Sequence, residues 1–305
     1  MTVWRQFGII SRNFGIAVAT VAQLDRALAS EAEGCWFDPS QSHQLEGHLM
    51  NKIAKRTVSA LTVAAVAVCG VLWAPAWLVA AVLSVLICLA QTEYSGLAAK
   101  CGGTMPRAGL VAALGHVVAV SCGVQPAASA VAATFFLAVV ALFGRSERPL
   151  VALATTAFGF FYVPFLLSHL ILARAENGAA GMLFLIAVVK ISDMGGFAFG
   201  VAFGRHKMCP SISPNKSWEG MAGSVLASCL VSACFMPLTR FGLPKALAFG
   251  VAAAVLGTLG DLVESRLKRE AGVKDSSAHL PAGMGGFLDM FDSLTFAPAM
   301  LLPFL

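Results

Sequence analysis

Acidic and basic side chains that could carry out chemistry gather near the C-terminal end of the chain. Asp261, Ser265 and Lys268 are spaced by four and three residues, so on a helix they lie on one face. Asp289 and Asp292 are three residues apart and share a face in the same way. Carboxylates that converge from two helices suit Mg²⁺, which binds one or two carboxylates together with substrate phosphates. The alternative is that the acids pair with nearby lysines and arginines and tie the two helices together.

A basic loop that contains glycine joins these two groups of acids. Glycine allows a backbone to come close to a ligand, and the N-terminus of the helix that follows attracts anions. Basic side chains and a metal ion can neutralise a nucleoside triphosphate and leave little covalent work to the protein. The loop therefore predicts a polyphosphate site, with the candidate residues Lys268, Arg269, Lys274, Asp275, Gly285 and Gly286.

A second polar stretch lies in the middle of the chain. Lys216 and Ser217 offer a cation and a hydroxyl group to a phosphate. Asp193 lies deep in an apolar segment, three residues after Lys190, where an isolated charge is costly. Either these two residues neutralise each other on one helix, or Asp193 belongs to the functional site.

The composition places these polar stretches in a membrane protein. Hydrophobic residues make up 58% of the 305 residues and charged residues 12%, with a mean hydropathy of +0.78. Soluble domains have about 25% charged residues, so we predict an integral membrane protein. No basic run is interleaved with aromatic residues, and we expect no nucleic-acid partner. The eight cysteines lack metal-ligand spacing, so neither a zinc site nor a disulfide framework is expected.

The apolar segments predict the architecture. A spanning helix needs about 20 mostly apolar residues, and the predicted fold is all-α, a polytopic membrane protein with about nine transmembrane helices. Residues 50–180 would form N-terminal transmembrane helices, and residues 181–305 a C-terminal catalytic transmembrane region. The predicted spans are 57–73, 75–92, 108–124, 127–143, 150–172, 181–203, 221–239, 245–263 and 287–305.

Residues 1–49 differ from the rest, because polar and acidic residues crowd together there without a sustained pattern. One interpretation is a disordered tail. The other is a spurious extension, since the run from Val21 to Pro39 looks like the conceptual translation of a transfer-RNA gene. We favour the second interpretation, in which the protein starts at Met50 and basic residues precede the first apolar run.

Lysines and arginines are unevenly divided between the two sides of the predicted bilayer. Placing Met50 in the cytoplasm puts 14 of them on that side and three on the other. Because cytoplasmic loops are enriched in Lys and Arg, the two polar loops, 204–219 and 264–286, are expected to face the cytoplasm together.

The C-terminal motif resembles the signature of the phosphatidate cytidylyltransferases, also called CDP-diacylglycerol synthases. The match is Ser265-x-x-Lys268-Arg269-x4-Lys274-Asp275 … Gly285-Gly286-x-x-Asp289-x-x-Asp292-Ser293. A second stretch of the same family is similar to the segment that runs from Asp193 to Gly220 and includes Ser213-Pro214-Asn215-Lys216-Ser217-Trp218-Glu219-Gly220. This chain departs from the pattern at three places: Met284 stands where the family usually has His, Met290 stands where it has Arg, and Pro281 is one position out of register.

The resemblance implies transfer of the cytidylyl group of CTP to phosphatidate, which gives CDP-diacylglycerol and pyrophosphate for phospholipid biosynthesis. CTP and a membrane lipid would be the partners, in the inner membrane of a bacterium, and a homodimer is left open. Catalytic residues would be Asp261, Lys268, Asp289 and Asp292. The ligands of Mg²⁺, and of a second cation such as K⁺, would be Asp193, Asp261, Asp289 and Asp292. The nucleotide and its phosphates would be bound by Lys216, Ser265, Arg269, Lys274, Asp275, Gly285 and Gly286.

Two other functions compete with this reading. One is a CTP-dependent enzyme that acts on another lipid, such as a polyprenol or phytol kinase or a CDP-archaeol synthase. The other is an ion-coupled transporter whose path is lined by Lys190, Asp193, Asp289 and Asp292. Many transporters are built from inverted repeats, and we see no internal repeat in this sequence. A CDP-alcohol phosphotransferase is disfavoured, because its Asp-Gly-x-x-Ala-Arg motif is absent.

Overall fold

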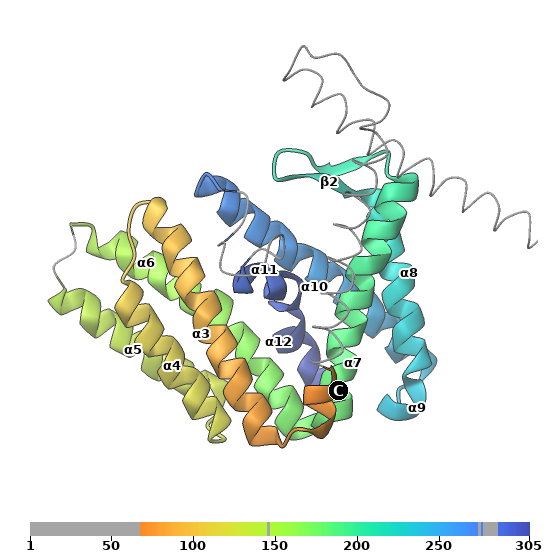
Figure 1. The fold of residues 1–305 in the computed structure, drawn as a ribbon, viewed down its shortest axis with the longest axis horizontal. Helices are drawn as coiled ribbons and strands as arrows, with labels where there is room; N and C mark the ends of the chain where they lie inside the picture. The colour runs from red at the N-terminus through yellow and green to blue at the C-terminus, as the bar shows by residue number, and fades with distance from the viewer. Residues whose placement is uncertain (1–67, 145–146, 274–275, 277–285) are drawn as a thin grey trace, which may run out of the picture.

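The structure is a computed structural model that describes residues 68–144, 147–273, 276 and 286–305, and it is predominantly helical (Figure 1). The predicted all-α class is confirmed. The elements in chain order are α3 (Ala76–Lys100), α4 (Pro106–Ser121), α5 (Pro126–Phe143), α6 (Pro149–Phe160), the π-helix η1 (Phe161–Phe165), α7 (Leu166–Phe203), β1 (Lys207–Cys209), β2 (Ser213–Ser217), α8 (Trp218–Cys234), α9 (Met236–Thr239), α10 (Leu243–Glu270), α11 (Phe287–Phe291), the 3₁₀ turn η2 (Asp292–Leu294), α12 (Ala297–Leu301) and the 3₁₀ turn η3 (Leu302–Phe304).

Prolines set where the first helices begin. Pro106, Pro126 and Pro149 each occupy the first turn of a helix, and Pro75 precedes α3. Proline suits these positions because its ring presets φ and because the N–H it lacks would have no partner inside the helix. These prolines therefore separate the first helices along the chain.

The number of spans differs from the prediction. In the part of the chain that the structure describes, five segments are long and apolar enough to cross a membrane: Ala76–Lys100, Pro126–Phe143, Pro149–Phe203, Leu243–Glu270 and Phe287–Phe304. Two shorter apolar helices are α4 and α8. The count of about nine spans is thus not confirmed, and most of the predicted first span, 57–73, lies outside the described residues.

Two predicted spans, 150–172 and 181–203, fall within one helical stretch of 55 residues. A straight helix of that length would be about 80 Å long, whereas the hydrocarbon core of a bilayer is about 30 Å thick. The stretch is interrupted at Gly178, where φ is 67° and ψ is −168°. Because the chain changes direction at this break, the single helical stretch can still cross the bilayer twice.

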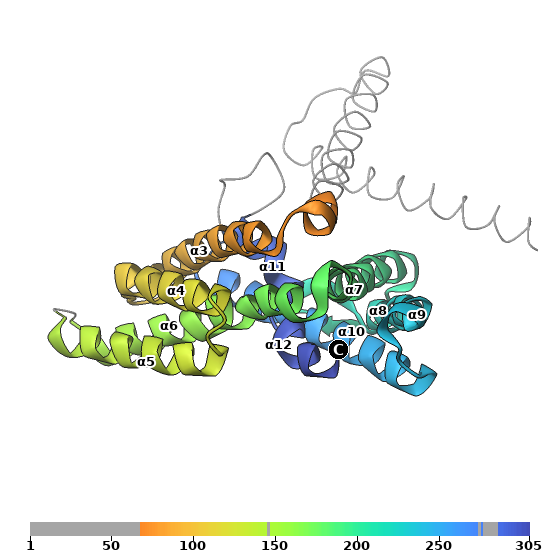
Figure 2. The same ribbon diagram turned by 90° about the horizontal axis from the view of Figure 1, so that it is seen from below.

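The helices form two groups with the C-terminal segment between them. Figures 1 and 2 show α3, α4, α5 and α6 on one side, α7, α8 and α10 on the other, and α12 near the middle. The side chain of Phe184 on α7 stacks on Phe249 of α10, with ring centroids 5.1 Å apart. This packing fixes α7 and α10 relative to each other.

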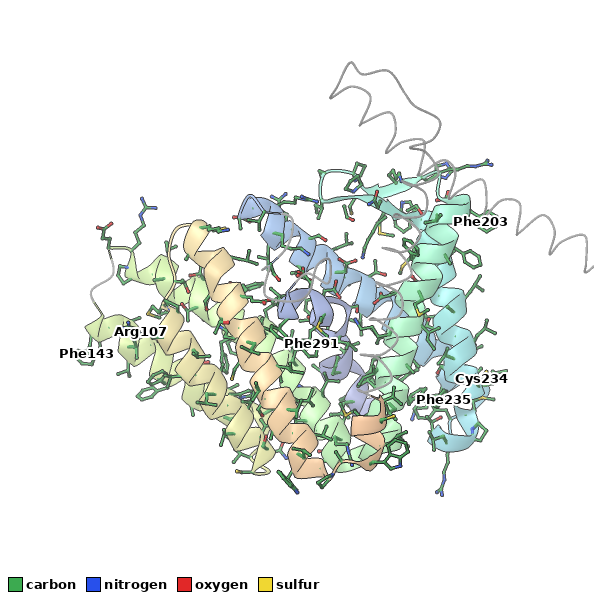
Figure 3. All side chains as sticks on the ribbon, viewed as in Figure 1. Arg107, Phe143, Phe203, Cys234, Phe235 and Phe291 are labelled. Atoms are coloured by element: carbon green, nitrogen blue, oxygen red, sulfur yellow. The ribbon has the colours of Figure 1, made fainter. Side chains whose placement is uncertain are left out.

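The outer surface is apolar, as expected for helices that face lipid. Figure 3 shows Phe143 and Phe203 projecting from opposite sides of the molecule, and their side chains are 80% and 61% exposed. Phe291, in contrast, lies in the centre and is 8% exposed. The residues around Phe291 are therefore enclosed by protein.

The predicted last span, 287–305, is not one helix. It is divided into α11, η2, α12 and η3. Irregular backbone at membrane depth requires that protein, not lipid, surrounds it, and Leu288, Leu294, Ala297 and Leu301 are all buried. The break places Asp292 at the start of η2, inside the helix bundle.

The 204–219 loop contains a short antiparallel hairpin that the sequence did not predict. Strands β1 and β2 pair Lys207 with Ser217 and Cys209 with Ser213. The hairpin leads directly into α8, whose N-terminus is capped by the Ser217 hydroxyl, which accepts a hydrogen bond from the Gly220 N–H. The hairpin therefore holds a fixed position over the end of α8.

Candidate active site

A cavity of about 690 Å³ lies between α7, the β1–β2 hairpin, α8, α10 and η2. Its charged lining residues come from five elements. They are Asp193 on α7, Lys207 on β1, Lys216 on β2, Asp261 on α10 and Asp292 on η2. Three of the four predicted metal ligands thus line one cavity, together with the predicted phosphate-binding lysine.

Asp261 is paired with Lys216 across the cavity. The Lys216 Nζ lies 2.6 Å from Asp261 Oδ2 and also donates to the Thr258 carbonyl oxygen at 3.2 Å. The Ser265 hydroxyl donates to Asp261 Oδ1 at 3.2 Å, as the spacing of four residues predicted. The Lys216 ammonium group of the hairpin is therefore directed at the Asp261 carboxylate of α10.

Asp292 reaches the cavity because α10 passes very close to η2. Gly260 is buried, and a Cβ atom at this position would overlap the carbonyl oxygen of Asp292. Only glycine allows this approach without a shift of one backbone. A residue next to a predicted metal ligand thus sets the distance between Asp261 and Asp292.

Glu219 fastens the hairpin to α8. Its carboxylate accepts hydrogen bonds from the backbone N–H groups of Arg205 and His206, and it lies 2.6 Å from His206 Nδ1. The hydrogen bond with the His206 side chain, followed by those with the backbone, lowers the pKa of Glu219 to about 2. Glu219 is therefore ionised at neutral pH and keeps the start of the hairpin in place.

Asp289 does not line the cavity. Its carboxylate accepts hydrogen bonds from Lys268 Nζ at 2.6 Å, from Gly286 N at 2.6 Å and from the Ser276 hydroxyl at 2.9 Å. Lys268 also lies 3.3 Å from Glu264, whose side chain is fully buried. In this second cluster, the contact between Lys268 and Asp289 joins α10 to α11. The predicted catalytic roles of both residues, and the predicted metal-binding role of Asp289, remain predictions.

Glu93 on α3 belongs to the same second cluster, and the sequence reasoning did not find it. One of its carboxylate oxygens accepts from the Leu288 N–H at 2.9 Å and from the Ser276 hydroxyl at 3.0 Å. Glu93 is 7% exposed. One signal in the sequence could have identified Glu93: it is a carboxylate at the end of an apolar run. Ionisable residues in membrane segments need partners, so such a residue is a candidate for a buried polar cluster.

The remaining predicted residues are dispersed. Arg269 is exposed in the last turn of α10. Gly286 precedes α11, where a Cβ would overlap the carboxylate of Glu93. Lys274, Asp275 and Gly285 lie outside the described residues, so the polyphosphate loop predicted from them is not tested by the structure.

The cavity suits a metal that arrives with phosphates. Among the described residues, no three acid, histidine or cysteine side chains stand close enough to chelate one ion. Asp193, Asp261 and Asp292 nevertheless face one cavity, and Mg²⁺ needs only one or two carboxylates when phosphate oxygens complete its shell. The donor set fits this mode of binding better than a cage made entirely by protein.

Comparison with known proteins identifies the family. The family model described as "Cytidylyltransferase family" matches residues 54–305. The chain is similar to the phosphatidate cytidylyltransferase of Mycobacterium bovis, with 41% identity over 146 residues that cover 46% of each chain. It is also similar to that of Staphylococcus saprophyticus, with 40% identity over 154 residues that cover 50% of this chain and 56% of the relative.

The match thus spans about half the length of these curated relatives. The family model covers far more of the chain than the pairwise matches do, including every element that lines the cavity. The protein belongs to the cytidylyltransferase family.

Proposed function

We propose that this protein transfers the cytidylyl group of CTP to phosphatidate, with CDP-diacylglycerol and pyrophosphate as products. The observation that carries the proposal is the cavity in which Asp193, Asp261 and Asp292 face Lys207 and Lys216 beside long apolar helices. The family match and the names of the relatives support the same reaction. A site of this kind serves two anionic substrates, of which one is a lipid.

The proposed reaction does not require a strong general base. A phosphate monoester is ionised near neutral pH, so an oxygen of the lipid phosphate can attack the α-phosphorus of CTP directly. The bond from the α-phosphorus to the oxygen that bridges to the β-phosphorus breaks, and pyrophosphate leaves with the electron pair. Lys207 and Lys216 reduce the repulsion between the two anions, and most of the rate gain comes from positioning and charge neutralisation.

One or two of the carboxylates of Asp193, Asp261 and Asp292 would hold Mg²⁺ together with phosphate oxygens of the substrates. When bound, Mg²⁺ neutralises charge on the phosphate oxygens and helps to align them. Lys216, which pairs with Asp261 in this structure, would bind substrate phosphate. A second cation such as K⁺ remains part of the proposal through the family resemblance alone.

We place the cavity on the cytoplasmic side of a bacterial inner membrane. The excess of Lys and Arg on the side of the hairpin supports this orientation. CTP would then enter from the cytoplasm, while the acyl chains of phosphatidate remain among the helices.

The test uses purified full-length protein in detergent with phosphatidate, Mg²⁺ and CTP labelled on the α-phosphate. Label in the lipid fraction is expected for the wild-type protein, and it should be lost in Asp292→Asn but kept in Glu176→Gln, which changes an exposed carboxylate elsewhere on α7. Label that stays in the aqueous phase would contradict the assignment. Transfer from γ-labelled CTP would instead indicate a lipid kinase, and transfer only to an archaeal ether lipid would indicate a CDP-archaeol synthase.

A further inference from the structure

Lys190 is a charged residue in the apolar interior that the proposed reaction leaves without a role. It lies on α7, three residues before Asp193. An ammonium group within a membrane span is costly unless it has partners. Its Nζ donates to the Met290 carbonyl oxygen at 3.0 Å and to the Ser293 hydroxyl at 2.9 Å. Lys190 therefore contacts the interrupted C-terminal segment, about 100 residues further along the chain.

These two acceptors lie on either side of Asp292. Met290 is in the last turn of α11, where carbonyl groups lack partners within the helix. A lysine that donates to such a carbonyl also interacts favourably with the negative end of the helix dipole. Lys190 thus joins the end of α11 to η2 and fixes the turn between them, although it comes from a different helix.

Lys216 and Lys190 serve different acids of the cavity. Lys216 is paired with Asp261, whereas Lys190 bonds to the residues on either side of Asp292. Lys190 therefore ties the turn that carries Asp292 to α7.

We propose that Lys190 is a positioning residue whose charge-assisted hydrogen bonds hold the turn that carries Asp292. The inference rests on the proposed function, because Asp292 matters only if the cavity is the active site. Lys190 acts through Asp292 and Ser293, and it does not contact the reacting atoms.

The first measurement tests the position of the turn and needs no activity. Lys190→Met keeps the length of the side chain and removes the charge, Lys190→Arg keeps the charge, and Lys245→Met is a matched control on α10, where the lysine lies over the Phe241 ring. Amide hydrogen exchange in residues 286–296 should become about tenfold faster in Lys190→Met, since a lost charge-assisted hydrogen bond is worth about a factor of ten or more. Lys190→Arg and Lys245→Met should stay close to wild type.

The second measurement is cytidylyl transfer. In Lys190→Met, kcat should fall about 10- to 100-fold with little change in the KM for CTP, because the turn is displaced while the lysines that bind phosphate remain. Lys190→Arg, which keeps the charge, should retain most of kcat.

Each arm has an outcome that overturns the inference. Unchanged exchange in Lys190→Met would disprove the positioning role, even if activity were lost. A loss of kcat in Lys190→Arg as large as that in Lys190→Met would show that the charge of Lys190 does not position the turn. If the wild-type protein transferred no cytidylyl group, the proposed function would fail, yet the exchange experiment would still decide whether Lys190 holds the turn.

Discussion

Replacing Gly260 by alanine is expected to displace the turn that carries Asp292. A Cβ on Gly260 would overlap the Asp292 carbonyl oxygen and lie 3.2 Å from its carbonyl carbon. Both atoms belong to the backbone, so α10 and η2 must move apart. Relief of the overlap needs a shift of about 1 Å, and a misplacement of that size can lower kcat about 100-fold. The same overpacking should reduce the free energy of unfolding by about 1–3 kcal/mol.

The assay combines cytidylyl transfer with thermal unfolding in detergent. Gly115→Ala is the matched control, because Gly115 is exposed on α4 and no atom lies within 4 Å of an added Cβ. Alanine there should leave activity unchanged and be neutral or stabilising by up to about 1 kcal/mol. If Gly260→Ala matched this control in both kcat and unfolding temperature, the close approach would not set the position of Asp292, and the reasoning would be refuted.

Two further predictions concern the residues that support the site. Glu93→Ala removes the acceptor of the buried Leu288 N–H, so the free energy of unfolding should fall by about 1–3 kcal/mol. Glu93→Gln keeps an oxygen acceptor, so its free energy of unfolding should fall by less. Equal decreases in the unfolding temperature of the two variants would contradict this role of Glu93. Glu219 has a pKa lowered from 4.5 to about 2, so its stabilising contribution is complete above pH 4.5 and is lost as the pH falls toward 2. The difference in unfolding temperature between wild type and Glu219→Gln should therefore be constant above about pH 5 and shrink steadily as the pH falls toward 2. A difference that did not shrink over this range would show that ionised Glu219 is not its source.

The features that depend on local chemistry could be predicted from the sequence. The apolar composition indicated membrane helices, and the structure is predominantly helical with long apolar segments. The number of spans could not be counted reliably, because apolar length alone does not show how segments join. A single glycine, Gly178, interrupts one helical stretch that contains two predicted spans.

The cavity could be predicted only in part. Lys216, Asp261 and Asp292 line it as the candidate list suggested, because the sequence motifs contain the residues themselves. Asp289 was grouped with Asp292 on the assumption of a continuous helix, in which residues three apart share a face. The break between α11 and η2 removes that shared face, and no local pattern encodes it, since its close contacts come from Gly260 and Lys190 on other helices.

The motif therefore contains two kinds of residues that spacing alone cannot separate. Asp261 and Lys216 present charge to the cavity, whereas Lys268 and Asp289 hold α10 against α11. Both kinds are charged, and both are costly to place in a membrane protein without partners. The difference lies in their position: Asp261 also has protein partners but lines the cavity, where a cation and phosphates can reach it, whereas Asp289 is bonded to Lys268, Gly286 and Ser276 away from the cavity lining. Loss of a second-cluster residue should thus act through the position of Asp292, because α11 and η2 are continuous in the chain.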